Sequence, residues 1–101
     1  MFIYVIKAKP TAKSKYSKDI AGAYVNCWID FKDSRAGQRL AEMLIEDADW
    51  TVLSKRPGRW EYKTLRDVLP EERQYYREAK ESGSSLVFNM WPLRKRKRRK
   101  K

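Results

Sequence analysis

The strongest chemical signal in this chain of 101 residues is a run of basic side chains at its C-terminus. Residues 94–101 read RKRKRRKK, and they supply most of the formal net charge of +11. Like charges at this density repel one another, which predicts a disordered segment in the free protein. Nucleic acid relieves that repulsion through phosphate contacts that do not depend on base sequence. The residues predicted to make these contacts are Arg94, Lys95, Arg96, Lys97, Arg98, Arg99, Lys100 and Lys101.

A second group of cations alternates with aromatic residues between Arg56 and Arg66. Arginine and tryptophan side chains that lie close together can stack on the bases of a single strand. The alternative is structural, with long basic stems lying over aromatic rings on the outer face of a sheet. The residues predicted to contact nucleic acid here are Arg56, Arg59, Trp60 and Lys63.

Several classes of chemistry lack the residues that they need. The chain has no histidine and a single cysteine, Cys27, so histidine-dependent triads and zinc sites of the Cys/His kind cannot form within one chain. Its four scattered glycines form no phosphate-binding loop. We therefore expect a non-enzymatic protein with no catalytic residues, no metal site, no cofactor and no small-molecule substrate.

The segment from Gly22 to Trp50 predicts a strand that leads directly into a helix. Apolar residues alternate from Ala23 to Phe31, which is the two-residue period of a strand. Further on, they recur every four residues from Ala36 to Ala48, as in an amphipathic helix, and Asp33-Ser34 offers an N-cap oxygen. The acidic residues near the end of this helix indicate a solvated face or a patch for a basic partner or the chain's own tail: Glu42, Glu46, Asp47 and Asp49.

The remaining segments predict further strands and a second helix. Alternation over residues 1–8, 50–53, 59–63 and 85–91 indicates strands, and Pro70 and Gly83 bound a helix over 70–82. Pro57-Gly58 predicts a tight reversal, and the lysine-rich residues 9–20 predict an exposed mobile loop.

The expected fold class is α+β, with a single mixed sheet of four to five strands. The elements follow the order strand, strand, helix, strand, short optional strand, helix, strand, and the two helices are expected to pack mainly on one face. Residues 1–92 are predicted to form a single domain, and residues 93–101 a disordered polybasic tail. Without residues 94–101, sixteen basic residues face thirteen acidic ones, so the domain is only mildly basic.

A cytoplasmic protein without a membrane span is expected from three features of the sequence. No segment reaches the roughly 18 apolar residues of a membrane-spanning helix. The lone Cys27 cannot form an internal disulfide, so nothing indicates secretion. The first ten residues are too short and too alternating for a signal peptide.

Three stretches resemble small single-domain bacterial proteins of about this size, to which no activity is attached. They are GAYVNCWIDF, the helix end EDADW, and YYREAKESGSSLVFNMWP, which closes on the Phe88–Pro92 motif. The resemblance covers residues 1–92 and implies an α+β fold but no chemistry, because it contains no catalytic signature. Such proteins are commonly acidic, and this chain differs from them in being basic and in having the tail.

Two functional hypotheses follow from these features. The first is a non-enzymatic module that contacts nucleic acid or RNA-rich assemblies, without sequence specificity, through the polybasic tail. The second is a protein–protein adaptor or inhibitor, of the small phage or toxin-system kind, that acts through an exposed sheet face or as a homodimer. A polybasic terminus is also typical of a nuclear-localisation signal, of a membrane-surface contact and of an appended solubilising segment.

Overall fold

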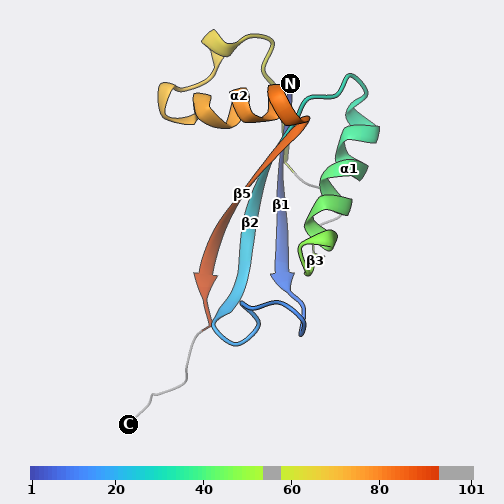
Figure 1. Cartoon of the computed structure of the whole chain (residues 1–101), viewed down its shortest axis with the longest axis vertical. Helices are drawn as coiled ribbons and strands as arrows, with labels where there is room; N and C mark the ends of the chain where they lie inside the picture. Colours follow the sequence, from blue (N-terminus) through green and yellow to red (C-terminus); the bar gives the residue numbers. More distant parts are fainter. Residues whose placement is uncertain (54–57, 94–101) are drawn as a thin grey trace.

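A computed structural model describes residues 1–53 and 58–93 of the chain. Its elements are β1 (Phe2–Pro10), β2 (Ile20–Ile29), α1 (Ser34–Asp47), β3 (Trp50–Val52), β4 (Gly58–Glu61), short 3-10 turns at Leu65–Asp67 and Pro70–Glu72, α2 (Arg73–Ser82) and β5 (Ser84–Pro92). The strands form one sheet in the order β3-β1-β2-β5, and β4 also pairs with β1 (Figure 1). The predicted α+β fold class is confirmed. Within the described residues, no helix is both long and apolar enough to cross a membrane.

The sheet is antiparallel throughout its described pairs, whereas the sequence predicts a mixed sheet. β2 and β3 do run parallel, as expected for two strands joined by a helix. They do not pair, because β1 lies between them and is antiparallel to both. β1 thus lies between β2 and β3, where it prevents these two parallel strands from pairing directly.

The turn predicted at Pro57-Gly58 begins outside the described residues, but the strands on either side of it do not form a hairpin. β3 pairs with Ala8–Pro10 and β4 pairs with Phe2–Val5, both antiparallel to β1. The two short strands therefore run in the same direction along one edge of β1.

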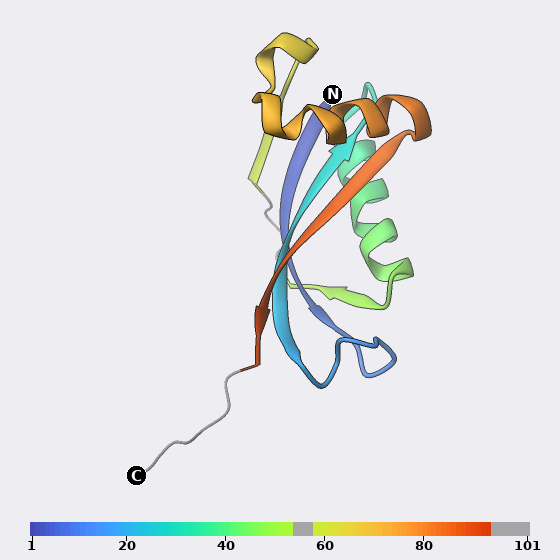
Figure 2. The same ribbon diagram turned by 60° about the vertical axis from the view of Figure 1, so that its left-hand side comes forward.

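The two helices lie on opposite faces of the sheet, and the prediction of one shared face is wrong. Figures 1 and 2 show α1 on one side of the strands and α2 crossing the other side near one end. On the α1 face, Tyr4 and Cys27 belong to one buried cluster with Ile45. On the α2 face, Ile3 and Trp28 form a second cluster with Val68, Tyr76 and Ala79. β1 is apolar on both sides, so both faces need cover.

The N-cap oxygen predicted at Asp33-Ser34 is confirmed, and the start of α1 is joined to the sheet. Asp33 is the N-cap, and its Oδ1 accepts hydrogen bonds from the backbone N–H of Arg35 (2.9 Å) and Ala36 (3.3 Å). The buried Tyr4 hydroxyl donates to the Ser34 carbonyl, and burial raises the pKa of this phenol. α2 ends as predicted at Gly83, whose φ of 94° suits glycine.

Candidate nucleic-acid interface

The predicted contact residues fall into two groups. Residues 94–101 and Arg56 lie outside the described part of the chain. Arg59 and Trp60 are on β4, and Lys63 follows that strand. Arg59 and Trp60 are consecutive in a strand, so their side chains point to opposite faces.

The structure does not bring the predicted stacking pair together. Arg59 pairs with Tyr4 on the α1 face, and its Nη1 donates to Ser34 Oγ at 3.1 Å. Trp60 pairs with Ile3 on the α2 face and is 44% exposed. The sequence places these residues close in the chain, but the strand period separates their side chains.

The point where the basic run begins is fixed by a backbone hydrogen bond. The N–H of Leu93, the residue before Arg94, donates to the carbonyl of Asp19 at 2.9 Å. Asp19 ends the connection between β1 and β2, which also carries Lys13, Lys15 and Lys18. Figures 1 and 2 show this connection and the end of β5 together at one end of the sheet. Residues 11–19, which form this connection, contain three lysines and one acidic residue, Asp19, so the connection is cationic.

The lysine-rich connection is folded by its own contacts. The N–H of Ser14 donates to Thr11 at 3.0 Å, and the N–H of Ser17 donates to Ser14 at 3.1 Å. Tyr16 lies 6.0 Å, between ring centroids, from the buried Trp50. The sequence predicts an exposed mobile loop here, and in the structure the three lysines are exposed on successive hydrogen-bonded turns.

One half of the α2 face has no described helix over it. α2 and the preceding turns cover the half that contains Ile3 and Trp28, while Tyr24 is 49% exposed on the other half. The strand register gives the residues that point to this open half, and none of them is acidic: Val5, Lys7, Lys9, Gly22, Tyr24, Asn26, Thr51, Leu53, Asn89 and Trp91. We call this surface the open half-sheet.

An aromatic pair with an adjacent cation lies on the open half-sheet. The ring centroids of Tyr24 and Trp91 are 5.3 Å apart, and their planes are inclined by 46°. Lys7 Nζ lies 5.9 Å from the Trp91 ring centroid. A Cβ at Gly22 would lie 2.5 Å from Cζ2 of Trp91, so the indole lies directly against the Gly22 backbone. Asn89 Nδ2 donates to the Tyr24 carbonyl at 3.1 Å beside the pair.

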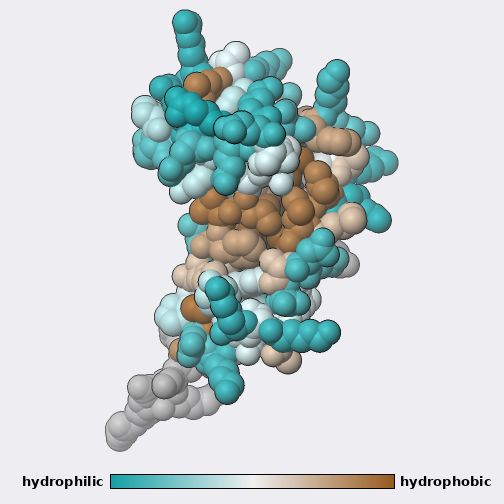
Figure 3. Space-filling model, viewed as in Figure 1, coloured by the Kyte–Doolittle hydropathy of each residue, from teal (hydrophilic) through white to brown (hydrophobic). Residues whose placement is uncertain are grey.

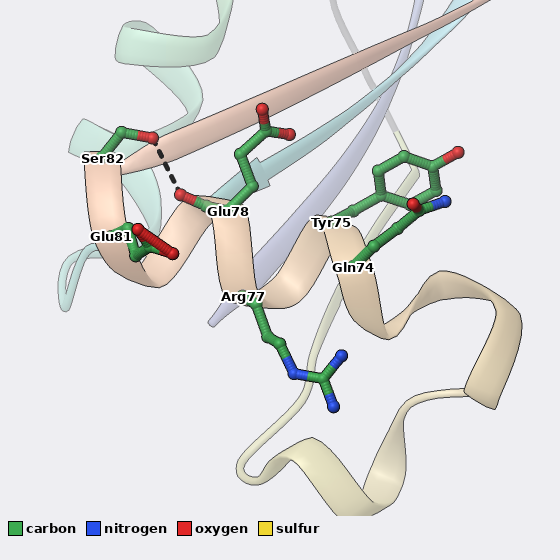
Figure 4. A pocket seen from close by; sticks show the side chains of 6 residues that line it. All are labelled: Gln74, Tyr75, Arg77, Glu78, Glu81 and Ser82. Atoms are coloured by element: carbon green, nitrogen blue, oxygen red, sulfur yellow. Dashed lines mark hydrogen bonds between the residues drawn. The ribbon is translucent and has the colours of Figure 1, made fainter.

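The surface hollows do not gather reactive groups. One hollow of about 700 Å³ lies along α2, and Figure 4 shows its side chains pointing in different directions, with Arg77 directed away from Glu78 and Glu81. A second hollow contains the exposed ion pair between Lys80 and Asp30, 3.7 Å apart. No group of three or more potential metal ligands lies together in residues 1–53 and 58–93.

The thiol of Cys27 lies in the core of the α1 face. Its Sγ is 3.6 Å from the Val25 carbonyl oxygen, and burial raises the pKa of this thiol to about 12. The sulfur is therefore protonated at neutral pH and has no access to solvent. Its role in the described structure is packing.

Comparison of the chain with protein families, with curated proteins and with solved structures gives no match. The resemblance of residues 1–92 to small bacterial proteins therefore stays a prediction.

Proposed function

We propose that this protein is a non-enzymatic module that binds nucleic acid, without sequence specificity, through the cationic end of its sheet. The observation that carries the proposal is the hydrogen bond between Leu93 and Asp19. Leu93, the residue before the basic run, is thereby held at the end of the β1–β2 connection, which carries Lys13, Lys15 and Lys18. Phosphates bound by the run would then lie within reach of the lysines on the folded domain.

The distribution of acidic residues supports binding on one side of the sheet. Glu42, Glu46 and Asp47 lie on α1, and Asp49 follows it, so these carboxylates belong to the opposite face. Repulsion between these carboxylates and phosphates disfavours an approach from the α1 side. The glutamates of α2 and the turn before it lie with that segment over the covered half of the α2 face: Glu71, Glu72, Glu78 and Glu81. The open half-sheet has no acidic side chain and includes Lys7 and Lys9. We therefore expect the nucleic-acid strand to bind on this half of the sheet.

Amide chemical-shift mapping tests this placement. A single-stranded oligonucleotide of about 12 nucleotides, added to the nitrogen-15-labelled full chain, is expected to shift the signals of Lys13, Lys15, Lys18 and Leu93 most strongly. Signals from α2 should stay nearly unchanged. The control is the same titration at high salt, where the shifts should largely disappear because phosphate contacts are screened. Shifts confined to α1 or α2, or shifts that persist at high salt, would contradict the proposal.

A second candidate function is self-association through the outer edge of β5. β5 is an end strand of the sheet, and none of its nine residues is charged. Natural edge strands commonly contain charges that prevent pairing with another chain. Leu86, Phe88 and Met90 are only partly buried, and Figure 3 shows an apolar surface between α1 and α2. The proposed occupant of this edge is the β5 strand of a second copy.

Antiparallel pairing of two β5 strands fits the charges of the chain. The other edge of the sheet carries Arg59 and Glu61 on β4, so an uncharged β5 matches a second β5 better than it matches that edge. Pairing like edges closes a two-fold dimer instead of extending a fibre. In this arrangement the basic runs of the two copies begin at opposite ends of the paired strands, which reduces their repulsion.

Sedimentation analysis of the full chain should show a dimer whose population rises with concentration. Met90→Lys adds a charge to the partly buried side of β5 and is expected to shift the equilibrium to monomer. The matched control is Thr51→Lys, which adds the same charge at an exposed position of β3 and should leave the dimer intact. A chain that sediments as a monomer at every concentration would exclude this candidate.

A further inference from the structure

We propose that the open half-sheet is a stacking site for single-stranded nucleic acid, with Trp91 and Tyr24 as the residues that contact bases. This inference rests on the proposed function and adds a defined site and substrate class to it. The cationic run alone would bind any polyanion, whereas a solvent-accessible aromatic pair selects strands whose bases are unstacked and free.

The position of Trp91 is fixed by the sheet beneath it. Because Gly22 has no side chain, the indole lies against its backbone, and any Cβ there would overlap Cζ2 at 2.5 Å and Cη2 at 2.9 Å. The Cζ2 and Cη2 edge of the Trp91 indole is therefore held against the sheet, and the side chain remains partly exposed. Tyr24, on the neighbouring strand and 49% exposed, lies 5.3 Å from it between ring centroids. The two rings form an aromatic surface that bases can stack on without base-specific hydrogen bonds.

The charges around this surface match a phosphate backbone. Lys7 Nζ lies 5.9 Å from the Trp91 ring centroid, at the outer limit of a cation–π contact. Its flexible stem allows the ammonium group to move from the ring to a phosphate when a base stacks on the indole. Lys9 points to the same side two residues further along β1 and is exposed. A strand crossing Trp91 would leave the sheet at the end where the basic run begins.

A duplex does not fit this surface equally well. Its bases are stacked and paired inside the helix, so a flat aromatic pair on a sheet cannot reach their faces. Phosphate contacts with the basic run remain available to both forms. The site therefore predicts a preference for single strands that depends on Trp91. The salt-dependent binding to phosphates should not depend on Trp91.

The test measures the affinity of the full chain for an oligothymidylate of about 12 nucleotides and for a duplex of the same length, by fluorescence anisotropy at fixed salt. Trp91→Ala is expected to weaken single-strand binding about 5- to 100-fold, the range found for loss of one stacked base. Duplex binding should change less than about twofold, because its contacts are to phosphate. Trp91→Phe keeps an aromatic face and should retain most of the single-strand affinity.

The matched control is Phe31→Ala, which removes a half-exposed aromatic side chain that follows β2 and lies outside the open half-sheet. Its single-strand affinity should stay within about twofold of the parent chain, because no stacked base is lost. An equal loss for single strand and duplex in Trp91→Ala, or a larger loss in Phe31→Ala, overturns the stacking site but leaves the proposed function standing. If the chain binds neither nucleic acid at low salt, both the stacking site and the proposed function are overturned.

Circular dichroism of each variant confirms that it is folded. Lys7→Gln keeps both aromatic rings and should weaken single-strand binding severalfold, which tests the site even if Trp91→Ala is unfolded.

Discussion

Trp28→Ala is expected to lower the free energy of unfolding by about 3–5 kcal/mol, the usual range for removing a buried tryptophan. Trp28 is 2% exposed at the centre of the α2-face cluster. Its ring stacks on Tyr62 at 5.8 Å and lies 6.1 Å from Tyr75, between centroids. Losing the indole leaves a cavity between the sheet and α2. We therefore expect α2 to detach from the sheet early during denaturation. Urea unfolding followed by far-ultraviolet circular dichroism measures the change.

Two further substitutions make the Trp28 result specific. Trp60→Ala removes the same side chain from a half-exposed position of the same face and should cost about 1 kcal/mol or less. Trp28→Phe should lower the free energy of unfolding clearly less than Trp28→Ala, because it keeps an aromatic ring. It also removes the indole N–H, which has no hydrogen-bond partner among the described residues. Equal costs for Trp28→Ala and Trp60→Ala would mean that α2 does not cover this face.

The elements of the fold could be predicted because their signals are local. Two-residue alternation identified the strands, and Asp33-Ser34 and Gly83 gave the start of α1 and the end of α2. The side of the sheet that each helix covers could not be predicted in the same way. Periodicity tells which residues share a face, as Ile3 and Trp28 do, but it does not tell which helix lies over them. The apolar residues on both sides of β1 were the available indication that both faces are covered.

Pro57-Gly58 led to the expectation that the chain returns after it, but β3 and β4 do not pair with each other. Proline followed by glycine favours a reversal in an isolated segment. Here both flanking segments find partners on the same edge of β1, through pairs such as Val52 with Ala8 and Gly58 with Val5. Cross-strand pairing along a common edge therefore decides the direction of the chain.

The candidate site was only partly accessible to sequence reasoning. The basic run of residues 94–101 is visible in the composition alone. The pair of Tyr24 and Trp91 is not, because it arises from the β2–β5 register, which sets Gly22 opposite Trp91 and Tyr24 opposite Asn89. The aromatic residues of these strands are visible in the sequence, but their different cover is not: α2 covers Trp28, while Tyr24 stays exposed.

Replacing the basic residues 94–101 by serine and glycine, with the chain length kept, should lower the affinity for nucleic acid at least about 100-fold at low salt. The reason is that the run supplies eight of the 24 basic residues and begins at the cationic end of the sheet. The lysines of the folded domain remain, so weak binding should persist. The stability of the folded domain should not change, because its two clusters lie within residues 1–93.

The salt dependence of this binding tests the central claim most directly. For the full chain on a single strand, the slope of log affinity against log salt is expected to be about −4 to −6, corresponding to six to eight neutralised phosphates. For the chain with residues 94–101 replaced, it should fall to about −1 to −3, which is the share of the lysines on the sheet and its β1–β2 connection. A slope that is the same for both chains, or a full chain that does not bind at about 50 mM salt, would contradict the account.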